Sequence, residues 1–131
     1  MGELNWVSVV LGAAGSFAIG FLWYGPLFGA AWKEDTGMTD DKIGSVTSVF
    51  VTATIFVLIG SLAANLLLDR TLGMIAHISG GLIIGVAAAA ALGMNYAFAA
   101  RPRRLLYIDG GYMIVAFAVM GAICAAFKSG G

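Results

Sequence analysis

Apolar residues dominate four long stretches of this 131-residue chain, and the few polar residues in them lie near their ends. The stretches cover residues 5–24, 43–67, 72–98 and 105–127. Each reaches the ~20 residues that an α-helix needs to cross about 30 Å of hydrocarbon, at a rise of about 1.5 Å per residue. The alternation and the shorter runs of a membrane β-barrel are absent. The pattern therefore predicts an all-α protein with four transmembrane helices.

The segment between the first two stretches has its own helical pattern. In residues 26–37, Phe28 and Trp32 recur at helical spacing against Lys33 and its acidic neighbours, and Gly37 is a suitable terminator. This pattern predicts a short helix lying in the membrane interface. With no linker or repeat elsewhere, residues 1–131 are expected to form a single domain, a compact antiparallel bundle.

Composition supports a membrane location, because 60% hydrophobic and 11% charged residues leave too little polar surface for a soluble globule of this size. Basic and acidic residues number seven each, so no net charge favours nucleic acid. Five basic residues fall on one side of the predicted helices and two on the other. The larger group is Lys33, Lys42, Arg101, Arg103 and Arg104, and the smaller is Arg70 and Lys128. The positive-inside rule then places both termini outside the cytoplasm.

Small residues at four-residue spacing indicate where helices approach closely, because lipid does not drive helices together and close packing must. The residues expected at such contacts are Gly12, Ser16, Gly20, Gly81, Gly85 and Gly93. This spacing is compatible with contacts inside the chain or with a second copy.

Polar residues inside the second and third stretches predict inward-facing surfaces. Thr47, Thr54, Ser61 and Asn65 lie within about 40° of one another on a helix, so this stripe should face the bundle. In the third stretch His77 and Asn95, eighteen residues apart, share a helix face.

Asp109 is the most informative ionisable residue, because it lies five residues, or about 7 Å along a helix, beyond Arg104 and thus near the headgroup boundary. One hypothesis makes it a structural acceptor of hydrogen bonds that pins the last two helices. A second makes it a proton- or cation-binding carboxylate in a cytoplasmic vestibule, and a third makes it a carboxylate solvated at the membrane interface. The candidate cluster for the first two hypotheses is Asp109, Asn95, Tyr24, Tyr112, Arg101 and Arg104.

Catalytic and metal-binding patterns are missing from the sequence. His77 has no second histidine to share a metal, and it is either a hydrogen-bonded packing residue or a group that titrates near neutral pH. Cys124 is the single cysteine of the sequence, which therefore offers no pair for an internal disulfide, and the glycines follow the packing pattern rather than a phosphate-binding loop. We therefore expect no enzyme activity, no catalytic residue and no cofactor.

Two sequence motifs resemble a known family. They are Trp-Tyr-Gly-Pro-Leu-Phe-Gly-Ala-Ala-Trp at residues 23–32 and the pair formed by Asn-Tyr at 95–96 with Ile-Asp-Gly-Gly-Tyr at 108–112. In order and spacing they are similar to the small bacterial membrane proteins grouped as domain of unknown function 1761. The resemblance implies a four-helix integral membrane fold over almost the whole chain. It also implies a location in a bacterial inner membrane, and it implies no activity, cofactor or ligand.

Two classes of function follow from these observations. The first is a protein that acts by association, as an accessory or scaffold subunit in a homo-oligomer or a larger membrane complex. The second is a minimal oligomeric transporter or channel, coupled to protons or cations through Asp109 and Asn95.

Overall fold

The computed structural model describes residues 5–39, 46–68 and 73–127, and within these ranges it contains helices and no strand. The elements are α1 (Trp6–Leu22), the π-helical η1 (Trp23–Leu27), α2 (Gly29–Thr36), α4 (Val46–Leu67), α5 (Met74–Phe98) and α6 (Arg103–Phe127). Four segments of this part of the chain are long and apolar enough to cross a membrane: Trp6–Leu27, Thr47–Leu67, Met74–Phe98 and Arg103–Phe127. The predicted all-α fold with four spanning helices is thus confirmed, and the chain is an integral membrane protein. The predicted starts of the second and third stretches, residues 43 and 72, lie outside the described ranges.

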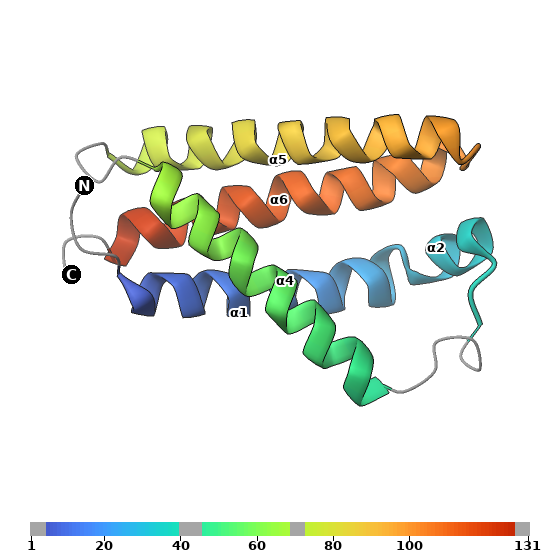
Figure 1. Cartoon of the computed structure of the whole chain (residues 1–131), viewed down its shortest axis with the longest axis horizontal. Coiled ribbons are helices and arrows are strands. Elements are labelled where there is room, and N and C mark those ends of the chain that lie inside the picture. Colours follow the sequence, from blue (N-terminus) through green and yellow to red (C-terminus); the bar gives the residue numbers. More distant parts are fainter. Residues whose placement is uncertain (1–4, 40–45, 69–72, 128–131) are drawn as a thin grey trace.

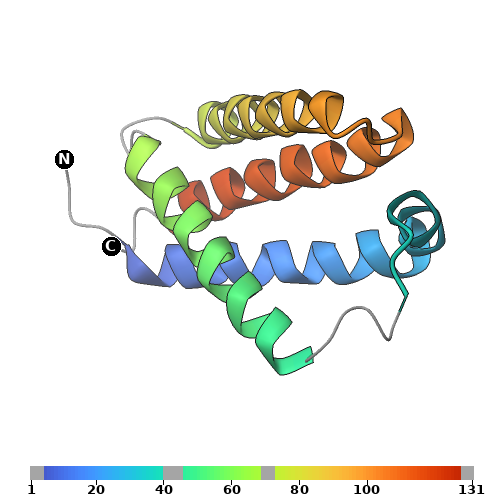
Figure 2. The same ribbon diagram turned by 45° about the vertical axis from the view of Figure 1, so that its right-hand side comes forward.

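The long helices form a bundle in which α6 is central. Figures 1 and 2 show α5 and α1 running along opposite sides of α6, while α4 crosses α1 obliquely. One end of the bundle, here called the terminal end, holds the start of α1 and the end of α6, where the Asn5 side-chain amide donates to the Phe127 carbonyl. The other end, here called the α2 end, holds α2 and the turn between α5 and α6 (Figure 1). A short helix between the first two spans was predicted, and α2 is that helix.

Helices α5 and α6 pack almost backbone to backbone. A Cβ atom added to Gly81 would lie 2.2 Å from the Phe117 carbonyl oxygen, and one added to Gly85 would lie 2.6 Å from the Ile114 Cα. From the other side, a Cβ on Gly121 would lie 2.2 Å from the His77 carbonyl oxygen. Side chains at these positions would push the helices apart, so glycine is what permits the contact.

The predicted packing glycines other than Gly81 and Gly85 face side chains rather than the backbone of a neighbouring helix. Gly12 faces the Ser61 hydroxyl of α4, 2.6 Å from where its Cβ would be, and the Ser16 hydroxyl donates to the Gly12 carbonyl over 2.9 Å. Gly20 faces the Tyr112 hydroxyl at 3.4 Å, and Gly93 faces the Leu106 side chain at 3.3 Å. All these small residues therefore lie at contacts inside the chain.

The polar stripe predicted to face inward on α4 does so only in the second half of that helix. Ser61 and Asn65 are buried, and the Ser61 hydroxyl donates to the Val9 carbonyl of α1 over 2.7 Å. Thr47 and Thr54 are exposed, which corrects the prediction. The reason is that α4 crosses α1 at an angle, so its first half leaves the bundle (Figure 1). The Thr54 hydroxyl instead donates to the Phe50 carbonyl in its own helix, over 2.7 Å.

A tight turn reverses the chain between α5 and α6. Ala100 has a left-handed backbone, with φ of 54°, and its N–H donates to the Ala97 carbonyl over 3.3 Å. The next N–H, of Arg101, donates to the Tyr96 carbonyl over 3.0 Å. These two bonds form a Schellman motif, and Pro102 follows it, where a helix cannot continue.

Candidate functional site

The site lies at the α2 end and begins with the π-helical turn η1. Pro26 has no N–H to donate, and the Phe28 N–H reaches back five residues to the Trp23 carbonyl, over 2.8 Å. The chain then turns so sharply that a Cβ on Gly29 would lie 2.5 Å from the Tyr24 carbonyl oxygen. This wider turn lets two consecutive side chains bond to α6. The Trp23 Nε1 donates to the Ile108 carbonyl over 2.7 Å, and Tyr24 reaches the next residue, Asp109.

Asp109 is the centre of the site. It is 9% exposed, and both of its carboxylate oxygens accept hydrogen bonds from phenols. The Tyr24 hydroxyl donates to Oδ1 over 2.7 Å, and the Tyr96 hydroxyl donates to Oδ2. One carboxylate thereby joins three segments, η1, α5 and α6.

Tyr112 lies beside this carboxylate without bonding to it. Its hydroxyl donates to the Ser16 carbonyl of α1 over 2.8 Å, and its ring meets the Tyr24 ring edge to face, with centroids 5.4 Å apart. On another side the Tyr24 ring contacts Trp32 of α2 in the same manner, at 5.9 Å. The Tyr24 phenol is thus held between α2 and α6, with its hydroxyl directed at Asp109.

The structure brings together half of the predicted cluster. Asp109, Tyr24 and Tyr112 meet, but Asn95 is exposed on α5 and Arg101 is exposed in the turn. The missed member is Tyr96, and a signal for it was present. Tyr96 follows Gly85 by eleven residues, about three helical turns, so it shares the face that packs on α6, whereas Asn95 lies about 100° away.

Arg104 also differs from the prediction, because it binds α2 rather than Asp109. Its Nε and one terminal nitrogen donate to the two carboxylate oxygens of Asp35 over 2.8 and 2.7 Å, and Glu34 lies 3.6 Å away. This paired geometry lowers the pKa of Asp35 from its ordinary value, chiefly through the hydrogen bond from Arg104. A bidentate contact holds α2 against the start of α6.

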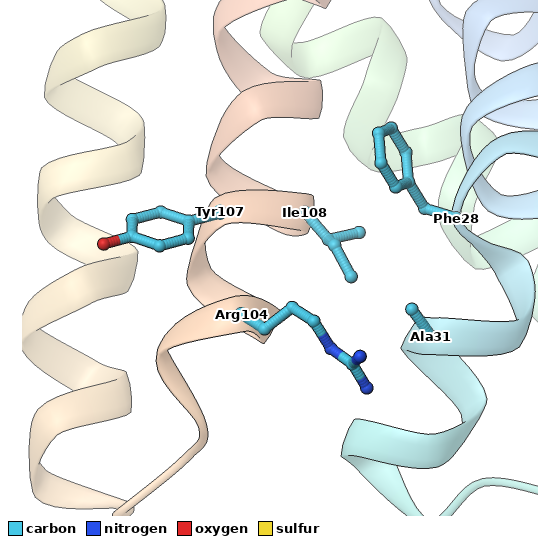
Figure 3. A pocket seen from close by; sticks show the side chains of 5 residues that line it. All are labelled: Phe28, Ala31, Arg104, Tyr107 and Ile108. Atoms are coloured by element: carbon cyan, nitrogen blue, oxygen red, sulfur yellow. The ribbon is translucent and has the colours of Figure 1, made fainter.

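A pocket of about 210 Å³ opens beside this ion pair. It is lined by Phe28, Ala31, Arg104, Tyr107 and Ile108. Figure 3 shows Arg104 extending from α6 toward Ala31 of α2, while Tyr107 points away on the other side of α6. The pocket is mostly apolar, and the only charge on its wall is Arg104, which Asp35 already neutralises.

His77 lies at the opposite, terminal end and is not part of the site. It is buried, its Nδ1 lies 2.9 Å from the Gly73 carbonyl and so donates to it, and its Nε2 has no partner among the described residues. Asn65 is buried as well, and its amide donates to the Ser61 carbonyl over 2.9 Å. In residues 5–39, 46–68 and 73–127, no three histidine, cysteine or acidic side chains form a group that could hold a metal ion.

The family model described as protein of unknown function (DUF1761) matches residues 7–125. No curated protein and no solved structure matches the chain.

Proposed function

Because the chain belongs to the DUF1761 family, which carries no assigned activity, we propose from its geometry that it acts by association, as an accessory or scaffold subunit of a membrane assembly. The observation that supports this proposal is the first half of α4. Apart from a ring contact between Phe50 and Phe21, with centroids 6.0 Å apart, most side chains of residues 47–59 are exposed. This part of α4 leaves the bundle in both views (Figures 1 and 2).

Threonines make this half of α4 suited to a protein partner rather than to lipid alone. Lipid tails satisfy exposed apolar side chains as well as a partner helix does, so apolar exposure by itself says little. Thr47, Thr52 and Thr54 are also exposed there, and hydroxyl groups and small side chains favour helix–helix contacts inside membranes. The partner in this proposal is a transmembrane helix, from a second copy of the chain or from another membrane protein.

The cluster around Asp109 supports the same proposal. A carboxylate whose two oxygens both accept hydrogen bonds from neighbouring helices has to share or give up these bonds when a proton or cation binds. Both oxygens of Asp109 already accept phenolic hydrogen bonds within the chain. Its arrangement is that of a structural connection between helices.

A transporter remains our second proposal, because an acidic side chain buried in a spanning helix is a common proton-binding group in membrane carriers. In that case Tyr24 and Tyr96 would release one oxygen of Asp109 when a proton or cation arrives. The Asp109 variants described in the Discussion separate the two proposals.

Cysteine crosslinking in native membranes tests the association proposal. Thr54→Cys places a thiol on the exposed half of α4, and Ile83→Cys, on the exposed side of α5, is the matched control. The only natural cysteine, Cys124, is buried in both variants. We expect Thr54→Cys to form a crosslinked dimer, or a crosslink to one other membrane protein, and Ile83→Cys to remain uncrosslinked. Equal crosslinking of the two variants, or none, together with a monomeric mass in mild detergent, would contradict the proposal.

A further inference from the structure

A groove of about 410 Å³ lies between α5 and α6. Small residues line much of it, among them Ala89 and Ala90 of α5 and Gly110 of α6, and its lining along α6 extends from Leu106 to Ile114. Apart from the hydroxyl of Tyr107, the side chains that line it are apolar. The groove can therefore accommodate a narrow apolar group.

The groove begins just below a guanidinium group. Arg103 precedes Leu106, Tyr107 and Gly110 by three, four and seven residues, so it lies on the same face of α6. At 1.5 Å per residue, the groove runs from about 5 Å to about 16 Å beyond Arg103 along the helix. That is where an acyl chain lies when its headgroup is level with Arg103.

Arg103 differs from the arginine next to it. Arg104 is paired with Asp35, whereas Arg103 is exposed and has no acidic partner among the described residues. It also lies in the first turn of α6, where unbonded N–H groups and the helix dipole favour an anion. An unpaired guanidinium is well suited to a phosphate group, which it can bind with two parallel hydrogen bonds.

We propose that this groove is a binding site for an anionic phospholipid, with the phosphate on Arg103 and one acyl chain in the groove between α5 and α6. Tyr107, 72% exposed, lies between headgroup and chain, at the depth where tyrosine is favoured in membranes. The site is independent of the α4 surface and does not rest on the association proposal.

Native mass spectrometry of the full chain in mild detergent tests the site. The probes are phosphatidylglycerol and phosphatidylcholine with identical acyl chains. The parent protein is expected to bind phosphatidylglycerol about fivefold more tightly, the preference that corresponds to about 1 kcal/mol for one arginine near an anionic lipid. Equal affinities for the two lipids would overturn the proposal.

Three variants separate the two parts of the site. Arg103→Gln should lose the preference for phosphatidylglycerol. Ala90→Phe, which fills the groove from an exposed position, should weaken the binding of both lipids. Arg101→Gln is the matched control, because it removes the same charge from the adjacent turn, which precedes α6 and is not part of the helix face that lines the groove. It should keep the preference.

Two results would refute the assignment. If Arg103→Gln and Arg101→Gln lose the preference for phosphatidylglycerol equally, the preference comes from the overall positive charge of this region rather than from a specific site. If the parent is a dimer that Ala90→Phe dissociates while lipid binding is unchanged, the groove holds a second copy of the chain.

Discussion

Replacing Asp109 measures how much one buried carboxylate contributes to joining the helices. In Asp109→Leu the side chain keeps a similar size but accepts nothing, so the hydroxyls of Tyr24 and Tyr96 lose their acceptors together. In Asp109→Asn the side-chain carbonyl oxygen still accepts a hydrogen bond from one phenol. The new amide group faces the other phenol, whose hydroxyl can rotate so that its oxygen accepts a hydrogen bond from the amide. The two variants therefore differ in hydrogen bonding more than in shape.

The magnitude follows from two hydrogen bonds between helices. Such bonds in membrane proteins contribute only about 0.6 kcal/mol on average and up to about 1.7 kcal/mol to stability. The values are small because the same polar groups find other hydrogen-bond partners when the protein is unfolded within the membrane. Two of them predict a loss of about 1–3 kcal/mol for Asp109→Leu. Asp109→Asn should lose less than half of that amount. The single variant Tyr96→Phe, which removes one donor and leaves the other bond intact, should fall between parent and Asp109→Leu.

The assay is reversible unfolding in mixed micelles, followed by far-UV circular dichroism, with the same proteins placed in liposomes carrying a pH gradient. We expect a stability order of parent, Asp109→Asn and Asp109→Leu, and no proton or cation flux from the parent. If Asp109→Leu is as stable as the parent, the structural role is refuted. If the parent dissipates the gradient and both variants abolish this flux with the fold intact, the transporter proposal replaces it.

Three further predictions address packing, the turn and topology. Gly85→Leu should lower stability by about 1–3 kcal/mol, because the new side chain would meet the α6 backbone. Gly93→Leu should lower stability less, because its side chain would meet only the flexible Leu106 side chain. Equal thermal midpoints for the two variants would mean that α5 and α6 do not pack as described. Ala100→Gly should raise stability by about 0.5–1 kcal/mol in chemical unfolding, since glycine adopts a left-handed backbone without steric cost; a loss of stability would show that the turn has another conformation. Alkaline phosphatase fused after Lys128 should be active, as expected for termini outside the cytoplasm, and activity of a cytoplasmic reporter at that position would reverse the orientation.

The spanning helices could be predicted because length and hydrophobicity alone decide them. The pairing of α5 with α6 also follows from the sequence, since Gly81 and Gly85 recur at a spacing that lets backbones meet. The direction in which α4 crosses the bundle could not be predicted. Its polar stripe has the same period throughout, and only the crossing angle decides that Ser61 is buried while Thr54 is exposed.

The partners of Asp109 were predicted in part for a related reason. Asn95 and Tyr96 are adjacent in sequence and both can donate to a carboxylate, so residue chemistry does not choose between them. The choice depends on the rotation of α5, which the glycine face determines. Arg104 was misassigned because its partner Asp35 is remote in sequence, and only the path of the chain through η1 brings α2 over the start of α6.

The hydrogen bond between Asn5 and Phe127 has a practical consequence for building linked proteins. It brings the start of the first spanning helix and the end of the last to the same membrane surface. Two units joined head to tail by a short flexible linker would therefore cross the bilayer in the same direction. Such a tandem could carry a substitution in one unit only, so the contribution of each subunit to an assembly could be measured separately.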